Sequence, residues 1–453
     1  MHRISVRALG PIRECEITLN RFMVLTGPQA HGKSTLAKAV FFFRTVQEDI
    51  LDLLRRGIFA PSDFRIRLEW RLRDKFQRLF GPLWDFPMEA EIEYHYNDET
   101  WMRIWPDEKE ASTDRLLRFN AEGSTFNSAS RLGPHSVFQI RFSANVVDYF
   151  RGLPRRFARE ADARQLMEEE TALHTLFSDP YRSVFIPAGR EMIALLTDQL
   201  NYIFTSMGED QRSGIDYCTE RYVTEILRLK HLFPGGIDGL LTDELARNPA
   251  LAHRERIETM RDRIGVLLKG AYQYSGQTER IVWEEDRQMR RVNLNFASSG
   301  QQEMVWITNL LFYYLTKSRP VFLILEEPES HLYPDAQKQM TELLALFGNG
   351  GNAVLMTTHS PYMLGTLNNL IYAWEIDRRG LSGAERVIEP DLWLDAESVS
   401  AWHVKGGTIQ EAKEPELGLI RNEYIEGASE EILRQSDALY ELSAQADHPQ
   451  GRV

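Results

Sequence analysis

The stretch from Gly27 to Thr35, GPQAHGKST, places glycine, lysine and hydroxyl side chains at a spacing that suits phosphate binding. Gly27, Gly32, Lys33 and Ser34 fit the pattern G-x-x-x-x-G-K-[ST]. Glycines allow backbone N–H groups to turn inward around an anion, and the start of the next helix adds partial positive charge. We therefore predict that this phosphate loop binds ATP and Mg²⁺. Lysine would reach the β- and γ-phosphates and serine would hold the metal. The remaining contacts would come from Pro28, Gln29, Ala30, His31 and Thr35.

Two acidic residues follow a continuous apolar run later in the chain. Val321–Leu325, VFLIL, is typical of a strand that is buried on both faces, and Glu326 and Glu327 come directly after it. A phosphate loop needs a carboxylate on the metal side, and Glu326 can bind Mg²⁺ directly or through water. We interpret Glu327 as the general base for the attacking water. Without Lys33 in the chain, the default interpretation would be two exposed acids at a strand end.

The elements around these residues indicate an α/β fold. Phe22–Leu25 reads as the strand before the phosphate loop, and residues from Thr35 onward read as the helix after it. A helix is expected from Asp335 to Phe347, followed by a buried strand at Ala353–Thr357. Strands that alternate with helices in this way favour a mostly parallel sheet.

Four motifs in this order resemble the ABC-type ATPase heads of the SMC, RecF and OLD-like group. They are the phosphate loop, SSGQQ at 298–302, EEPESHL at 326–332 and TTHS at 357–360. The resemblance implies an α/β P-loop NTPase head with a mixed sheet, an α/β insertion and a short helical arm. It also implies that a signature segment caps the γ-phosphate of an ATP held by a second copy. That segment comprises Ser299, Gly300, Gln301 and Gln302.

The same resemblance assigns two further positions. His359 matches the switch histidine, which contacts the γ-phosphate, and we count it with Glu327 as catalytic. Leu332–Asp335 matches the loop that contacts the other subunit. Tyr333 stands where the family usually has aspartate, and Glu326 stands where aspartate is more common. The second change keeps the charge and lengthens the side chain.

Arg190 ends the sequence IPAGR, which follows a predicted strand at Ser183–Ala188. In this ATPase group the position lies near the loop that senses ATP through a glutamine. Two interpretations of Arg190 stay open at this point. It contacts nucleotide or DNA, or it forms a salt bridge at the start of a helix.

We divide the chain into five segments by motif and composition. They are an ATPase part with the phosphate loop at 1–50, an α/β insertion at 51–180, a mostly helical arm region at 181–280, an ATPase part with the later motifs at 281–395, and a hairpin followed by a helix at 396–453.

Composition excludes some classes of function. The chain has 453 residues and a net charge of −13, so the molecule as a whole is not a basic nucleic-acid binder. No apolar run is long enough to cross a bilayer, and Cys15 and Cys218 lack metal-ligand spacing. We therefore expect a cytoplasmic protein without a membrane partner.

The combined motifs look closest to the ATPases of bacterial anti-phage systems of the Septu or PARIS type. That resemblance implies an ATPase that forms a dimer unit or a higher homo-oligomer and controls a separate HNH or Toprim nuclease. Three other functions are alternatives. A DNA-repair ATPase would bind DNA directly through Arg155 and Arg156, a scaffold would bind ATP without turnover, and a membrane transporter subunit fits the motifs less well.

Overall fold

The computed structural model describes most of the chain. The described residues are 1–57, 61–81, 87–107, 137–156, 163–190, 193, 216–276, 278–317, 319–421, 423–424, 433–437 and 439. Within them, no helix combines the length and the apolar character needed to cross a membrane.

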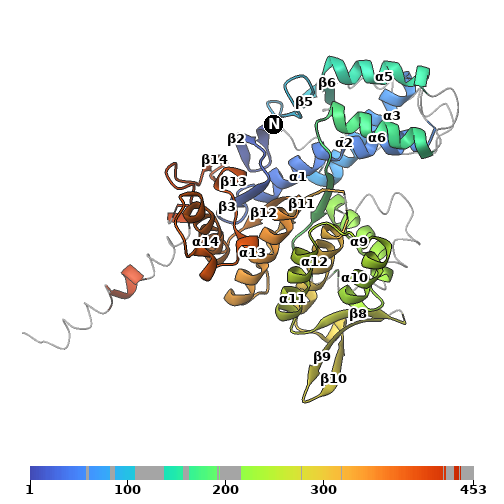
Figure 1. The fold of residues 1–453 in the computed structure, drawn as a ribbon. Helices are drawn as coiled ribbons and strands as arrows, with labels where there is room; N and C mark the ends of the chain where they lie inside the picture. Colours follow the sequence, from blue (N-terminus) through green and yellow to red (C-terminus); the bar gives the residue numbers. More distant parts are fainter. Residues whose placement is uncertain are drawn as a thin grey trace, which may run out of the picture.

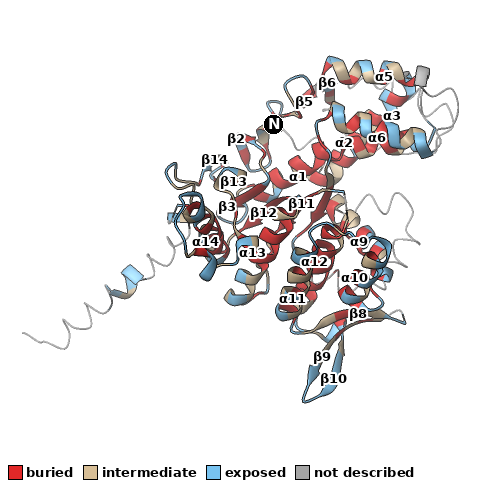
Figure 2. Ribbon diagram, in the orientation of Figure 1, coloured by how far each residue is buried: buried red, intermediate tan, exposed pale blue. Residues whose placement is uncertain are grey.

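A six-stranded mixed sheet forms the centre of the molecule, with the strand order β14-β13-β3-β12-β11-β7 (Figure 1). Every neighbouring pair is parallel except β13 and β14. The strands are β3 (Phe22–Thr26), β7 (Arg182–Ile186), β11 (Val321–Glu326), β12 (Ala353–Thr358), β13 (Val399–Lys405) and β14 (Thr408–Glu411). All residues of β3, β11 and β12 are buried, as the continuous apolar runs predicted (Figure 2). The predicted mixed α/β fold is confirmed.

A second, antiparallel sheet joins the amino-terminal strands to strands from the middle of the chain. Its order is β2-β1-β4-β5-β6. These strands are β1 (Arg3–Leu9), β2 (Ile12–Thr18), β4 (Glu91–His95), β5 (Trp101–Asp107) and β6 (Val137–Phe142). Helices α1 (Lys33–Arg44), α2 (Val46–Arg55), α3 (Pro61–Phe80), α5 (Ala144–Arg156) and α6 (Ala163–Leu176) contribute to the core that it shares with the central sheet. The segment expected as an insertion therefore extends a sheet that begins at the amino terminus.

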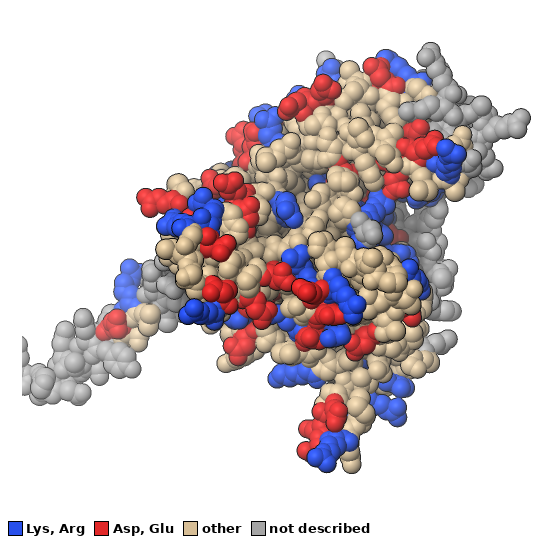
Figure 3. All heavy atoms as spheres, viewed as in Figure 1, with Lys and Arg blue, Asp and Glu red and all other residues tan. Residues whose placement is uncertain are grey.

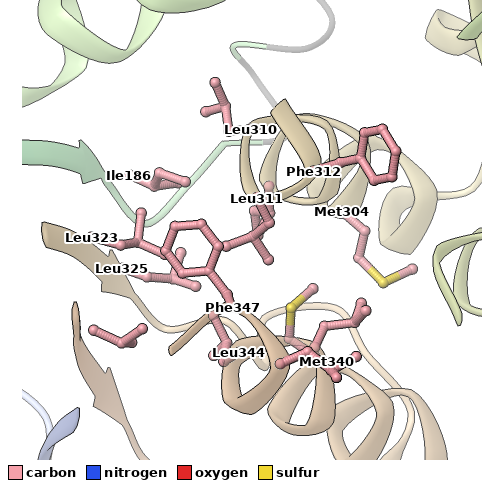
Figure 4. Packing of buried hydrophobic residues seen from close by; sticks show 14 of the residues in the cluster. Ile186, Met304, Leu310, Leu311, Phe312, Leu323, Leu325, Met340, Leu344 and Phe347 are labelled. Carbon is pink, nitrogen blue, oxygen red and sulfur yellow. The ribbon is translucent and has the colours of Figure 1, made fainter. Parts of the chain in front are cut away.

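The other face of the central sheet packs against a layer of helices. Leu323 and Leu325 of β11 lie against side chains of α12 and α13, among them Leu311 and Phe347 (Figure 4). The layer comprises α9 (Tyr217–Leu229), α10 (Gly236–Arg247), α11 (Arg254–Leu268), α12 (Ser299–Leu315), α13 (Pro334–Asn349) and α14 (Pro361–Arg378). This packing buries both faces of the strands that carry the motifs, so their ends are held firmly in place.

Residues 181–280 were expected to form a helical arm. In the described part, Ile257, Met260 and Ile264 of α11 are buried in the same core as α12 and α13. The segment that projects is the hairpin of β9 (Thr278–Glu285) and β10 (Gln288–Asn293), which with β8 (Ala271–Ser275) forms a three-stranded sheet (Figure 1). The apolar face of α11 packs into the core, so this helix does not project as an arm.

The carboxyl-terminal hairpin pairs with the strand that leads into the phosphate loop. Val399–His403 of β13 lie parallel to Phe22–Thr26 of β3. The helix expected after the hairpin in the 396–453 segment lies largely outside the described residues. The same holds for the helix expected after Arg190.

Candidate nucleotide-binding site

The phosphate loop follows β3 and leads into α1, and two of its glycines are required by steric contact. Gly27 has a φ of 134°, and a Cβ there would lie 2.2 Å from the carbonyl oxygen of Val404. At Gly32, with a φ of 107°, a Cβ would lie 2.4 Å from Ile12. Both conformations favour glycine. A side chain at Gly27 would therefore collide with the backbone of β13, and one at Gly32 would require both a left-handed conformation and a shift of the Ile12 side chain.

Lys33 begins α1, and its side chain bends back over the loop. Its Nζ atom donates to the carbonyl oxygens of Gly27 and Pro28 at 2.8 Å each. The residue is only 5% exposed, and burial lowers the pKa of the ammonium group, with Glu327 and Glu329 acting in the opposite direction. A buried cation that is held over a cradle of backbone groups is suited to an anionic ligand.

Glu326 and Ser34 come together on the metal side of the loop. Glu326 is buried, and its Oε2 atom accepts a hydrogen bond from Ala188 N at 3.3 Å. Burial raises the pKa of this carboxyl group, and the nearby hydroxyl of Ser34 and the charge of Lys38 act against the shift. The Oε1 atom is buried with no hydrogen-bond partner within the described residues.

That unpaired oxygen fits a hard divalent cation. Among the described residues, no three His, Cys, Asp or Glu side chains gather as a metal-binding group. Mg²⁺ does not need such a group, because it keeps several waters and takes one or two carboxylates together with substrate phosphates. Glu326 and Ser34 are therefore the residues that would hold Mg²⁺ at this site.

Glu327 adopts a left-handed backbone conformation with a φ of 43°. Such a conformation is uncommon for a residue with a side chain and costs about 1–3 kcal/mol. It persists because the backbone N–H donates to Thr357 O at 3.0 Å and the carbonyl accepts from Arg190 at 3.0 Å. The turn directs the carboxylate to His359, whose Nε2 atom lies 3.2 Å from Glu327 Oε1.

His359 lies between the candidate base and the phosphate-loop lysine. Its Nδ1 atom lies 3.4 Å from Lys33 Nζ. An ammonium group only donates, so this contact fits an imidazole that accepts at Nδ1 and carries its proton on Nε2. Nε2 would then donate to Glu327, and the histidine hydrogen bond is the main cause that lowers the pKa of Glu327.

Glu329 positions the histidine and was given no role from the sequence. Its Oε1 atom accepts from the backbone N–H of His359 at 2.6 Å and from the Thr358 hydroxyl at 2.9 Å. The sequence shows Glu329 as part of EEPE, but nothing there reveals that it reaches the next strand of the sheet. That contact depends on the parallel pairing of β11 and β12.

Arg190 is almost completely buried inside the chain. Its side chain is 1% exposed, and its Nε atom lies 2.9 Å from Glu303 Oε2. Its Nη1 atom donates to the carbonyl oxygens of Pro187 and Glu326, both at 2.6 Å. Of the two interpretations left open, the structure therefore supports the salt bridge, although the partner Glu303 belongs to a distant helix.

The signature segment, Ser299 to Gln302, forms the first turn of α12. Its two glutamine side chains form hydrogen bonds within the chain, whereas Ser299 and Gly300 form no side-chain hydrogen bond with the residues that the structure describes. Ser298 caps the helix, and Gln301 completes a capping box with it. Gln301 Nε2 also donates to Leu268 O at 2.8 Å, and Gln302 Nε2 donates to Leu294 O at 3.0 Å. Ser299 is exposed and Gly300 is half-buried. The two glutamine side chains thus form hydrogen bonds within their own chain, whereas Ser299 and Gly300 remain accessible to a ligand.

The loop before α13 packs against the signature segment. A Cβ at Gly300 would lie 3.1 Å from His331 O and 3.6 Å from Leu332. Two aromatic side chains stand out beside this contact, because Phe296 is 80% exposed and Tyr333 is 77% exposed. Both residues are close to this contact in the sequence, since Phe296 precedes Gly300 by four residues and Tyr333 directly follows Leu332.

Taken together, the buried strand ends, the glycine cradle and the paired acids define a P-loop ATPase domain. Within that class, residues 22–365 match the family described as "AAA domain, putative AbiEii toxin, Type IV TA system". The chain belongs to this family.

Comparison of the fold with solved structures gives low similarity scores. The SMC head domain from Thermotoga maritima has 12% sequence identity and a TM-score of 0.35, with 90% of this chain and 97% of that chain covered. The Smc head domain of Pyrococcus furiosus, bound to the C-terminal domain of ScpA, has 10% identity and a TM-score of 0.34, with 91% and 96% covered. No curated protein sequence gives a significant match.

Proposed function

We propose that the protein hydrolyses ATP at the phosphate loop. The observation that carries this proposal is the convergence of Lys33, His359 and Glu327, which come from three separate parts of the chain. His359 lies between the other two and contacts Lys33 through Nδ1 and Glu327 through Nε2. A cation for phosphate, an imidazole and a carboxylate of lowered pKa form a set that can bind a triphosphate and activate a water.

Each residue has a distinct role in the proposed reaction. Lys33 holds the β- and γ-phosphates, while Ser34 and Glu326 hold Mg²⁺, which when bound neutralises charge on the phosphate oxygens. Glu327 accepts the proton of the attacking water. His359 orients Glu327 by hydrogen bonding and lies close enough to Lys33 to face the terminal phosphate. The other loop residues, Pro28 to His31 and Thr35, contribute backbone contacts.

The site is completed by a second copy of the chain. In this proposal Ser299 and Gly300 of one copy close over the ATP held by the other. Support comes from the exposure of Ser299 and from the exposed aromatic side chains of Phe296 and Tyr333 beside it. The start of α12 adds a partial positive charge that favours an anion. A dimer unit is the smallest assembly that satisfies this arrangement, and higher homo-oligomers can be built from it.

The wider role that we propose is control of an effector in bacterial anti-phage defence. Nucleotide-dependent closure would change how a separate HNH or Toprim nuclease is held, through a difference in affinity for the two states. The motif resemblance supports this role, as does the family description, which names a toxin of a toxin–antitoxin system. A cytoplasmic location stays a prediction.

Phosphate release by the full-length protein tests the activity. Turnover should be abolished in Lys33→Met with loss of ATP binding, since that contact contributes about 1.5–3 kcal/mol. Glu327→Gln should bind ATP normally and accumulate as a dimer without turnover. Hydrolysis at the wild-type rate in Glu327→Gln would remove its role as base. No turnover in the wild-type protein under any condition would favour the scaffold alternative.

Direct DNA binding remains a competing prediction. It was based on Arg155 and Arg156 at the end of α5, whose side chains lie outside the described ones. On the face drawn in Figure 3, acidic and basic side chains are intermingled over the described residues. Salt-dependent DNA affinity that Arg155→Ala and Arg156→Ala remove would establish this alternative. A pull-down with and without ATP would instead identify a nuclease partner.

A further inference from the structure

Arg190 connects the signature helix to the strand end that carries both acids of the site. Its guanidinium group makes an ion pair with Glu303 of α12 and donates to the backbone carbonyls of Glu326 and Glu327. Because guanidinium is planar and rigid, the positions of these partners depend on one another. One buried side chain therefore links two parts of the proposed catalytic machinery.

The Glu303 end of this link lies one helical turn from the signature serine. Ser299 begins α12, and Glu303 stands four residues later with 1% of its side chain exposed. Residues four apart lie on the same face of a helix. A displacement of the helix start by a nucleotide on another subunit would therefore displace Glu303 as well.

The other end of the link holds a strained residue. Glu327 keeps its left-handed backbone because Thr357 and Arg190 bind its N–H and carbonyl groups. Strained conformations persist only where surrounding contacts enforce them. Loss of the Arg190 contact would allow Glu327 to relax, and its carboxylate would leave the position that His359 now sets.

We propose that Arg190 is a positioning residue that couples the two ATP sites of the dimer. In each copy, contact of Ser299 with the partner's ATP would be transmitted through Glu303 and Arg190 to the copy's own Glu327. Hydrolysis at either site then depends on nucleotide at both. This inference rests on the proposed function, and it explains why a buried arginine donates to the backbone carbonyls of both acidic residues.

Steady-state ATP hydrolysis by full-length variants tests the coupling. In Arg190→Met and in Glu303→Gln, kcat should fall by about 10- to 10²-fold because the base is misplaced, whereas ATP affinity should stay near wild type. The Hill coefficient for ATP should be above one in the wild-type protein and should fall toward one in both variants. A nucleotide-contact role for Arg190 would instead raise KM and weaken ATP binding.

A matched control separates positioning from general destabilisation. Arg44 and Asp179 form a similarly buried ion pair at 2.6 Å, with side chains 4% and 1% exposed, and Arg44 is at the opposite end of α1 from Lys33. Arg44→Met should lower the melting temperature but leave kcat and the Hill coefficient unchanged. An equal loss of kcat in Arg44→Met would overturn the assignment of Arg190.

A double variant guards against simple failure to fold. Arg190→Met combined with Glu303→Met removes both charges together, a change that buried pairs often tolerate. Its kcat should be as low as that of Arg190→Met, since the link is already broken. Wild-type kcat in the double variant, or a wild-type Hill coefficient of one, would refute the coupling. If Lys33→Met still abolishes turnover in that case, the proposed ATPase function stands without it.

Discussion

Glu329→Gln tests whether the site depends on residues that never touch the nucleotide. The carboxylate accepts hydrogen bonds from His359 N at 2.6 Å and from the Thr358 hydroxyl at 2.9 Å. The substitution keeps the shape of the side chain and removes its negative charge. Both partners donate to the same oxygen, Oε1, so the amide oxygen can still accept from them, but as two neutral hydrogen bonds. The amide NH2 then takes the place of Oε2, which is buried with no hydrogen-bond partner among the described residues.

The expected size of the effect follows from these two contacts. A hydrogen bond to a charged group contributes about 1.5–3 kcal/mol, roughly twice the value for a neutral pair. Converting both contacts to neutral ones should therefore lower the free energy of unfolding by about 1.5–3 kcal/mol. The larger effect should be on catalysis, because His359 connects Lys33 with Glu327. A small displacement of such a group can reduce the rate by about 10²-fold.

The assay is phosphate release across a range of ATP concentrations, with thermal unfolding measured on the same samples. Glu342→Gln serves as the control, because Glu342 is also buried and pairs with Arg263 at 2.7 Å in the helical layer. Both variants should lose stability, but only Glu329→Gln should lose kcat. Wild-type kcat in Glu329→Gln, or equal losses in the two variants, would refute the reasoning.

Three further predictions follow from the geometry. Gly27→Ala should abolish ATP binding in equilibrium titration, because its Cβ would lie 2.2 Å from a carbonyl oxygen of β13 and could not be accommodated. Tyr333→Arg should prevent ATP-dependent dimers in sedimentation, whereas Met167→Arg on α6, also an exposed apolar residue, should not. The pKa of Glu327 is lowered, mainly by the hydrogen bond with His359. As the pH falls, kcat/KM should therefore keep its value until the pH is below the usual pKa of glutamate. In His359→Gln the pKa of Glu327 should rise, so the acidic limb of the pH profile of kcat/KM should move to higher pH. An acidic limb that does not move would exclude Glu327 as the group that titrates.

Much of the central sheet could be predicted because each of its buried strands is a continuous apolar run in the sequence. Val321–Leu325 and Ala353–Thr357 are continuous apolar runs, and the structure buries them on both faces in neighbouring strands. The second sheet could not be predicted in the same way. Pairing of β1 with β4 joins residues that are distant in the chain, and local alternation does not specify the partner.

The residues of the candidate site also differ in whether a local pattern or a long-range contact defines them. Lys33 and Ser34 were predicted from the spacing of their motif, and Glu326 and Glu327 from their place directly after an apolar run. Glu329 and Glu303 were not given roles, because their partners lie on other strands or helices. Gln301 also illustrates the limit. The motif suggests a ligand contact, yet its side chain caps its own helix and bonds Leu268.

Adjacent acids at a strand end would ordinarily be similar groups in one environment, and the fold makes them different. Glu326 is the last residue of β11, whereas Glu327 follows the strand in a left-handed backbone conformation. Glu326 therefore becomes buried beside Ser34, where the pKa is raised, whereas Glu327 meets His359, where the pKa is lowered. Environments that push two carboxyl groups apart are a general way to give them separate tasks. The proposed metal ligand and the proposed general base can thus be adjacent in the sequence, because one backbone conformation, held by Thr357 and Arg190, keeps their environments distinct.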